Sequence, residues 1–117
     1  MPGSGITVVV GPSGSGKSTL TRVCNRLIDP SRGVVRLWGR DLRDLDVLGL
    51  RRSVGMVFQR PTVVAGTVRE NLAATGVADR QQHGDMLATV GLEPAILDQA
   101  ARTLSGGEAQ RVCLARA

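Results

Sequence analysis

The residues 11–19, GPSGSGKST, combine glycines, hydroxyls and one lysine in the spacing G-x-x-x-x-G-K-S/T. Glycines let a backbone curl so that successive N–H groups point at one anion, and a following helix adds the positive end of its dipole. The pattern therefore predicts a cradle for a polyphosphate. Lys17 is expected to reach the β- and γ-phosphates, and the Ser18 hydroxyl to hold a Mg²⁺ ion that bridges them. The predicted phosphate-binding residues are Gly11, Ser13, Gly14, Ser15, Gly16, Lys17, Ser18 and Thr19.

The context of this loop supports the prediction. The apolar, β-branched run 6–10 precedes it and predicts a strand that is covered on both faces of a parallel sheet. Residues 17–27 carry apolar side chains at helical spacing, so a helix with one buried face should follow. Lys17 is the only lysine among fifteen cationic residues, and a compact ammonium suits a phosphate in a tight loop better than a guanidinium does. The alternative interpretation is a flexible Gly/Ser turn.

A second stretch, Leu104 to Glu108, has the composition of an anion site at a helix start. Ser105 and Glu108 form an S-x-x-E capping box, and Ala109, Val112 and Cys113 share one face of the helix that follows. Gly106 and Gly107 weaken a first helical turn by about 1 kcal/mol each relative to alanine. Their bare N–H groups beside the Ser105 hydroxyl suit a second phosphate contact. The alternative interpretation is an ordinary helix cap.

Gln59 follows the apolar run 54–58, which predicts another strand that ends at Pro61. A polar side chain at the carboxyl end of a parallel strand lies where ligands of α/β proteins bind. Gln59 is therefore a candidate to orient water or a metal ion, and the alternative is a solvated loop side chain.

The remaining elements are expected to position these residues. A strand is predicted over 34–38, a short helix after Asp46, a capped helix over 67–74, and a helix over 80–90 with Asp79 as cap and Gly91 as stop. Residues 29–33 should end the first helix. The stretch 67–101 shows helical patterns only, which predicts a helical subdomain within an α/β fold.

Composition excludes several classes of protein. The net charge of +5 comes from scattered arginines with two aromatic residues in all, so we expect no nucleic-acid partner. Cys24 and Cys113 lack the spacing of a zinc or redox site, and both are expected to be buried, reduced thiols of a cytosolic protein. His83 has no partner at ligand spacing and is expected at the surface. No apolar run is long enough to span a bilayer.

Together, GPSGSGKST at 11–19, VGMVFQRP at 54–61 and LSGGEAQRVCLARA at 104–117 resemble the nucleotide-binding domain of ATP-binding cassette (ABC) proteins, over nearly the whole chain. The resemblance implies a P-loop NTPase (RecA-like) α/β core with an inserted helical subdomain, incomplete at both ends. We expect 1–66 to be the partial core, 67–103 the helical subdomain and 104–117 the signature motif with its helix.

The family implies ATP and Mg²⁺ as cofactors and roles for the matching residues. Lys17 and Gln59 would be catalytic, Ser18 and Gln59 would contact the metal, and Ser105, Gly106, Gly107 and Glu108 would close over ATP held by a second subunit. The working unit would be a head-to-tail dimer bound to transmembrane permease subunits at the inner face of the cell membrane. Importers of phosphate or metal ions are the most similar type.

The sequence departs from the family pattern in two ways. The family's Mg²⁺-binding Asp, general-base Glu and switch His follow the signature helix and are absent from these residues, as is an aromatic residue placed to stack on adenine. Because no carboxylate would activate water, we expect the 117 residues alone not to turn over ATP. Two alternatives stay open: a soluble ABC ATPase of translation or repair, and a P-loop small-molecule kinase.

Overall fold

The computed structural model describes residues 5–117 and divides the chain into two compact units, Met1–Met56 and Val57–Ala117. The predicted three-part division into 1–66, 67–103 and 104–117 stays a prediction.

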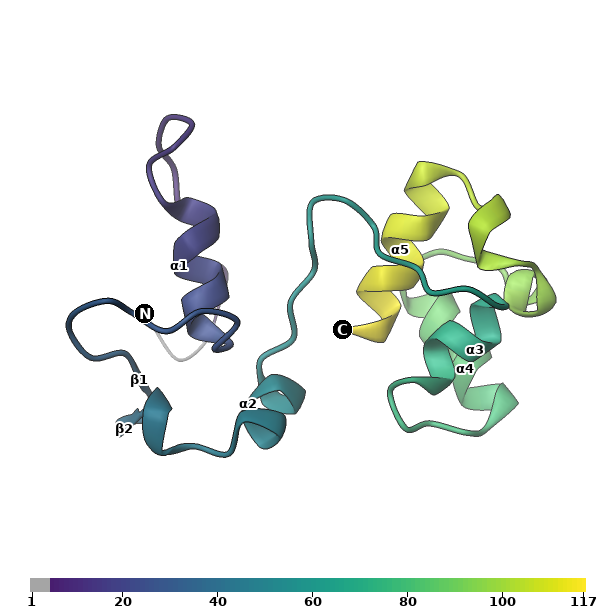
Figure 1. Ribbon diagram of the computed structural model, residues 1–117. Helices are drawn as coiled ribbons and strands as arrows, with labels where there is room; N and C mark the ends of the chain where they lie inside the picture. Colours follow the sequence, from purple (N-terminus) through teal and green to yellow (C-terminus); the bar gives the residue numbers. More distant parts are fainter. Residues whose placement is uncertain (1–4) are drawn as a thin grey trace. The chain divides into compact units, whose positions relative to one another are not determined.

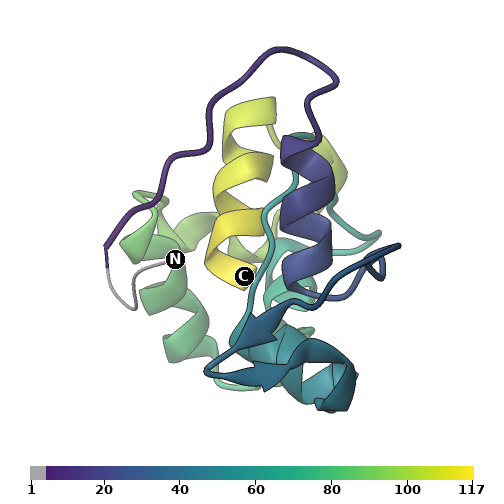
Figure 2. The same cartoon turned by 90° about the vertical axis from the view of Figure 1, so that its left-hand side faces the viewer.

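The first unit begins with a long loop that leads to helix α1, Lys17–Cys24 (Figures 1 and 2). A hairpin follows, in which β1, Arg36–Leu37, pairs antiparallel with β2, Arg40–Asp41. The turn uses Trp38 and Gly39, both at positive φ, which is the geometry of a two-residue hairpin turn. The short 3₁₀ helix η1, Leu42–Asp44, and helix α2, Val47–Ser53, complete the unit.

Side chains of two arginines hold the elements of the first unit together. Arg26 Nη1 donates to the carbonyl oxygens of Leu42, at 3.1 Å, and Leu45, at 3.2 Å. Arg51 Nη2 donates to the carbonyl oxygen of Arg26 at 2.7 Å. These bonds fix the chain after α1 against η1 and α2, beside a small set of buried residues, Val23, Leu42 and Leu50.

The second unit is helical. It contains α3, Val68–Ala73, α4, Arg80–Thr89, and α5, Gly106–Arg116, which pack together in Figure 1. The 3₁₀ helices η2, Pro94–Asp98, and η3, Ala101–Thr103, connect α4 to α5. The core of the unit comprises Val68, Leu72, Leu87, Leu92, Leu97 and Val112. At its surface, Asp98 forms ion pairs with Arg69, at 3.1 Å, and Arg80, at 2.8 Å.

The predicted helices of the second unit are confirmed. The helix predicted over 67–74 begins with a complete capping box of Thr67 and Glu70. The helix predicted over 80–90 is capped by Asp79 and ends one residue early, before Gly91 at φ 69°. The short helix after Asp46 is also present, as α2.

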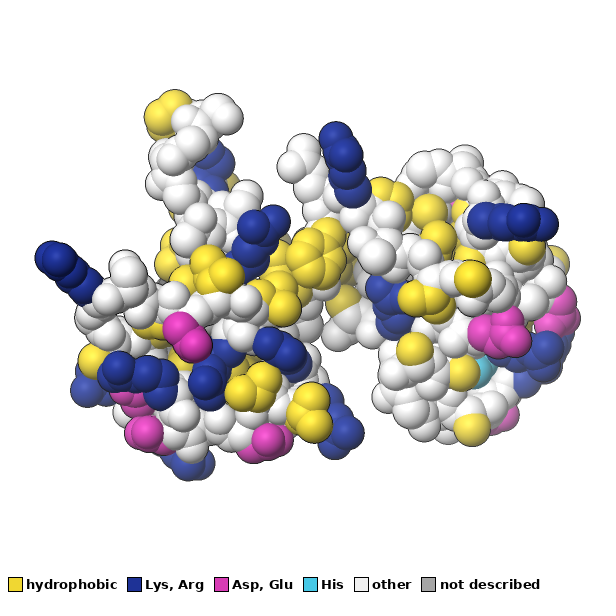
Figure 3. Space-filling model, in the orientation of Figure 1, with side chains coloured by type: hydrophobic (Ala, Val, Ile, Leu, Met, Phe, Trp, Pro, Cys, Tyr) yellow, Lys and Arg dark blue, Asp and Glu magenta, His cyan; other side chains and the backbone are white. Residues whose placement is uncertain are grey.

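The predictions of strands over 6–10 and 54–58 are wrong for the described residues, since both segments lie outside any strand. A strand requires a partner for its backbone groups, and the paired strands that the structure describes, β1 and β2, pair with each other. Without a sheet to cover them the apolar side chains are exposed, Ile6 to 93% and Val10 to 85%. Figure 3 shows hydrophobic side chains at the surface of both units.

Four further expectations are corrected. The strand predicted over 34–38 is limited to β1, because the chain turns at Trp38. Helix α1 ends at Cys24 rather than Leu27, since Arg26 adopts a left-handed conformation with φ 52°. Cys24 is only half-buried, on the margin of this small unit. His83 is buried, with 1% exposure, because it lies one turn before Leu87 on the inner face of α4.

Candidate functional site

The loop before α1 contains glycines in a left-handed conformation and ends at a helix start without a side-chain cap. Gly14 and Gly16 have φ values of 81° and 88°, a conformation that side chains other than glycine rarely adopt. Gly16 is the N-cap of α1 and offers no side chain to cap it. The other α-helices that the structure describes begin with a side-chain cap, from Asp46, Thr67, Asp79 or Ser105. The start of α1 is thus left open to an external acceptor.

The unused hydrogen-bond donors test whether a phosphate fits this loop. Of the loop amides, Ser15 N–H donates to the carbonyl oxygen of Pro12, at 3.3 Å. Six other backbone amides of the loop and of the first turn of α1 donate to no residue that the structure describes. They belong to Ser13, Gly14, Gly16, Lys17, Ser18 and Thr19. Six amides clustered at a helix start form a donor set that suits the oxygens of a polyphosphate.

Lys17 closes this loop from the side of the helix. Its Nζ donates to the carbonyl oxygens of Gly11, at 2.8 Å, and Pro12, at 2.6 Å, and lies 3.2 Å from Ser15 Oγ. The lysine therefore crosses the loop and contacts both its first residues and its middle. Its ammonium group is the formal positive charge nearest the free amides in sequence, where a phosphate would be attracted.

Ser18 and Thr19 supply hydroxyl groups beside the loop. Both side chains are exposed, and neither hydroxyl forms a hydrogen bond with a described residue. A free hydroxyl next to a polyphosphate cradle is a suitable oxygen ligand for Mg²⁺. Among residues 5–117, no group of three or more His, Cys, Asp or Glu side chains is arranged to hold a metal ion.

The second predicted anion turn, at the start of α5, is a complete capping box. Ser105 Oγ and Ser105 N–H both donate to Glu108 Oε2, at 2.7 and 2.8 Å, and Glu108 N–H donates back to Ser105 Oγ at 3.3 Å. These bonds lower the pKa of Glu108, with the Ser105 hydroxyl as the largest cause. Glu108 is therefore a carboxylate that fixes the Ser105 side chain.

Gly106 and Gly107 follow Ser105 in the first turn of α5. Both are exposed, and a Cβ atom added to either would meet no atom within 4 Å. Neither glycine has a positive φ, so nothing in the backbone of this turn requires glycine. Their N–H groups also donate to no described residue. The backbone and packing of this turn thus give no structural requirement for glycine at either position.

Gln59 lies in an irregular, exposed segment of the second unit, and its side chain bonds to no described residue. It follows no strand, so the sheet-edge argument for this residue fails. Sequence reasoning missed the residues that hold this segment: Gln110 and Arg116 donate to the carbonyl oxygens of Phe58 and Thr62. No pattern in the sequence could have revealed these contacts, because they join positions 52 and 54 residues apart.

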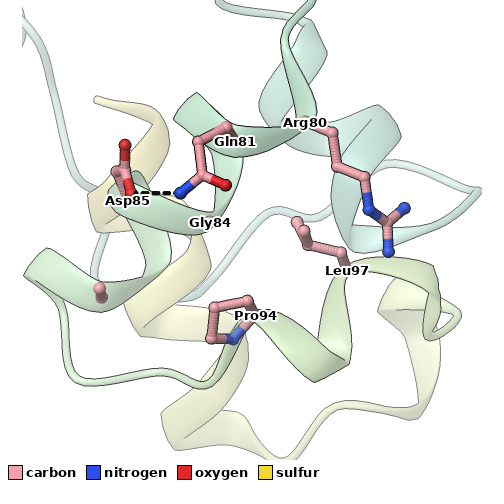
Figure 4. Close-up of a pocket in the computed structure, with 7 residues that line it drawn as sticks. Arg80, Gln81, Gly84, Asp85, Pro94 and Leu97 are labelled. Atoms are coloured by element: carbon pink, nitrogen blue, oxygen red, sulfur yellow. Dashed lines mark hydrogen bonds between the residues drawn. The ribbon is translucent and has the colours of Figure 1, made fainter.

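A pocket of about 350 Å³ lies elsewhere in the second unit, between α4 and η2 (Figure 4). Its polar side chains are already paired, since Gln81 Nε2 donates to Asp85 at 3.2 Å and Arg80 binds Asp98. Pro94 and Leu97 form the opposite side, and no predicted site residue lines it.

In the described part of the chain, no helix is long and apolar enough to cross a membrane.

The family model for ABC transporters matches residues 1–117. The chain belongs to the ABC transporter family. It is 45% identical over 114 residues to the putative ABC transporter ATP-binding protein YjkB of Bacillus subtilis, covering 95% of this chain and 46% of YjkB. It is 39% identical over 127 residues to the phosphate import ATP-binding protein PstB of Campylobacter jejuni, covering 96% of this chain and 52% of PstB.

A solved structure of the ATP-binding cassette MJ0796, a dimer in a post-hydrolysis state with ADP and Pi, has the same fold. It matches with a TM-score of 0.75 and 31% identity, covering 90% of this ABC chain and 52% of that one. The P-loop NTPase fold, with mixed helix and sheet, is thereby confirmed. The chain spans about half the length of YjkB and of PstB.

Proposed function

We propose that this chain binds MgATP and serves as the ATP-binding subunit of an ABC transporter, whose hydrolysis of ATP drives transport of a small solute. The single observation that carries the proposal is the uncapped start of α1. Here the loop and the first helical turn have six amides without described acceptors, and Lys17 contacts the loop. Membership of the ABC family supports ATP as the anion.

Each residue of the loop has a separate task in this proposal. The six free amides bind the β- and γ-phosphates, and Gly14 and Gly16 allow the backbone to adopt the required conformation. Lys17 exchanges its contacts with the Gly11 and Pro12 carbonyls for phosphate oxygens and offsets their charge. Ser18 contributes a hydroxyl ligand to Mg²⁺, which when bound neutralises charge that develops on the transferred phosphoryl group.

Gln59 is the proposed second polar contact of Mg²⁺ or of the attacking water. An amide can orient water but is a poor base, and the Glu108 carboxylate already accepts two hydrogen bonds from Ser105. The described site residues therefore contain no free general base. For this reason we propose that residues 1–117 by themselves bind ATP but do not turn it over.

Ser105, Gly106 and Gly107 are the proposed contact to ATP that is bound by a second copy of the subunit. Their exposed turn carries two free amides, and Glu108 holds the Ser105 hydroxyl in place. The dimeric MJ0796 cassette supports a working unit of two subunits. In this proposal the dimer binds transmembrane permease subunits at the inner face of the cell membrane. We further propose import of phosphate or a metal ion, which the similarity to PstB supports.

Association driven by MgATP tests the proposal. Ser105→Arg places a bulky cation in the exposed turn of α5, and Ser31→Arg makes the same change at an exposed serine outside the proposed sites. Sedimentation velocity should show that MgATP dimerises the wild-type and Ser31→Arg chains and leaves Ser105→Arg monomeric. Dimerisation of Ser105→Arg at the wild-type MgATP concentration would contradict the proposed role of this turn.

A further inference from the structure

The segment that carries Gln59 has no secondary structure of its own. We call residues 58–64 the Gln59 segment. Its described residues form no backbone–backbone hydrogen bonds, either with each other or with the rest of the chain. Pro61 lacks an N–H group, and the residue before a proline is restricted to extended conformations. The course of this segment must therefore be set by contacts with side chains.

Three side chains from two helices supply those contacts. Gln110 Nε2 donates to the carbonyl oxygen of Phe58 at 3.0 Å, and Arg116 Nη2 donates to that of Thr62 at 2.9 Å. Asn71 binds the end of the segment twice, because it accepts from Val64 N–H at 2.8 Å and donates to the Val64 carbonyl at 3.0 Å. Gln59 thus lies between an anchor on its preceding residue and one three residues later.

The helix that provides two of these anchors is itself firmly packed. Val112 of α5 is fully buried, and Ala109 and Cys113 are also in the interior of the unit. Asn71 of α3 is fully buried as well. The same α5 begins with the Ser105–Glu108 turn. One helix therefore carries the proposed second anion turn at its start and holds the Gln59 segment farther along.

From these contacts we infer that Gln110 and Arg116 are positioning residues for Gln59. They fix the Gln59 segment to α5, so that Gln59 and the Ser105–Glu108 turn move as parts of one rigid piece. The inference rests on the proposed function for the role of Gln59 toward Mg²⁺, whereas the anchoring itself is a property of the second unit alone.

Two variants remove the anchors with little change in volume. Gln110→Glu replaces the donor amide with a carboxylate that cannot donate to the Phe58 carbonyl, and Arg116→Met removes the guanidinium. Gln82→Glu, at an exposed glutamine of α4 without a described hydrogen bond, makes the same charge change as Gln110→Glu and is the matched control.

Limited digestion with chymotrypsin reports on the anchoring. Phe58 is the only phenylalanine, so cleavage between Phe58 and Gln59 is identified by mass spectrometry and compared with cleavage at the buried Leu87. Each anchor variant should be cut at Phe58 about fivefold faster than the wild type, the effect of one lost hydrogen bond, with no change at Leu87. An unchanged rate at Phe58, or an equal rise at both sites, would overturn the anchoring.

A second readout separates positioning from a merely structural contact. The Mg²⁺ concentration needed for tight ATP binding, measured by fluorescence titration of the full chain, should rise in both anchor variants toward that of Gln59→Ala. ATP affinity without Mg²⁺ and the Gln82→Glu control should be unchanged. Faster cleavage with an unaltered Mg²⁺ requirement would overturn the positioning role. A wild-type chain that binds no ATP would instead refute the proposed function, while the digestion would still decide whether the anchors exist.

Discussion

Lys17 Nζ donates a hydrogen bond of 2.8 Å to the carbonyl oxygen of Gly11, so the lysine spans the loop whose amides are free. This contact fixes the ends of the loop six residues apart, next to the uncapped start of α1. It also places a positive charge beside backbone amides that donate to no described residue. In the proposed function, recognition of the anion depends on the backbone conformation at a few glycines and on one side chain.

Replacement of Gly16 by alanine tests the backbone conformation. Because Gly16 has φ 88°, the Cβ atom costs about 1–2 kcal/mol in the conformation that aligns the amides. ATP affinity in a fluorescence titration should fall about fivefold to thirtyfold. Gly91→Ala is the control, since Gly91 has φ 69° at the end of α4, outside the proposed site. It should lower stability and leave ATP affinity unchanged, and an equal loss of affinity in both variants would contradict the prediction.

Gly107→Ala should have opposite effects on stability and association. Alanine favours the helix by up to about 1 kcal/mol over glycine, and the structure has open space around the new methyl group. Urea unfolding should therefore show a gain in the free energy of unfolding, while MgATP-driven dimerisation weakens. A variant that is more stable and dimerises normally would show that the turn does not approach a ligand.

How much of this fold could be predicted from the sequence depends on how far apart in the sequence the interacting residues lie. The capping boxes of α3 and α5 join residues three positions apart, and both were predicted correctly. The strands predicted over 6–10 and 54–58 depended on partners remote in sequence, and the described residues provide none. The expectation for His83 rested on its lack of metal-ligand partners and is wrong, because its spacing of four from Leu87 places it on the buried face of α4.

In the candidate site, too, local features were predictable and contacts between residues far apart in the sequence were not. The loop at 11–19 was predicted with its backbone geometry, since glycine spacing and the helix start are local features. The roles of its residues toward ATP and Mg²⁺ stay predictions. The anchors of the Gln59 segment could not be predicted, because side chains of α3 and α5 reach it only after the helices have packed.

Asn71→Ala should destabilise the second unit. Asn71 is fully buried and bonds to both backbone groups of Val64 and to the Thr67 carbonyl at 2.9 Å. Removal of its amide leaves both backbone groups of Val64 without partners, which costs about 2–3 kcal/mol in the free energy of unfolding. The Thr67 carbonyl keeps its bond from the backbone N–H of position 71, at 3.1 Å. Urea unfolding measures the loss, and exposed Gln82→Ala should change stability by less than about 0.5 kcal/mol. Equal stabilities of the two variants would contradict this assignment.

The pH dependence of stability should reveal the capping box of α5. The pKa of Glu108 in the folded chain lies below its ordinary value, so the stabilisation is fully present above about pH 4.3 and is lost as pH falls through the folded pKa. Thermal unfolding of wild type and Glu108→Gln between pH 7 and pH 3 should show their difference shrinking below pH 4.3. Glu93→Gln, at an exposed carboxylate with no described hydrogen bond, is the control. A difference for Glu108→Gln that is constant with pH would contradict the prediction.

The most direct test of the proposed function is the affinity of the chain for MgATP with and without the Lys17 ammonium. Lys17→Met should weaken binding between about tenfold and 100-fold, the range expected for a hydrogen bond to a charged group, in a calorimetric or fluorescence titration. Arg22→Met removes one positive charge from the last turn of α1 and should change affinity by no more than about twofold. Wild-type affinity in Lys17→Met, or no binding of MgATP by the wild type, would contradict the proposal that this loop binds a nucleotide polyphosphate.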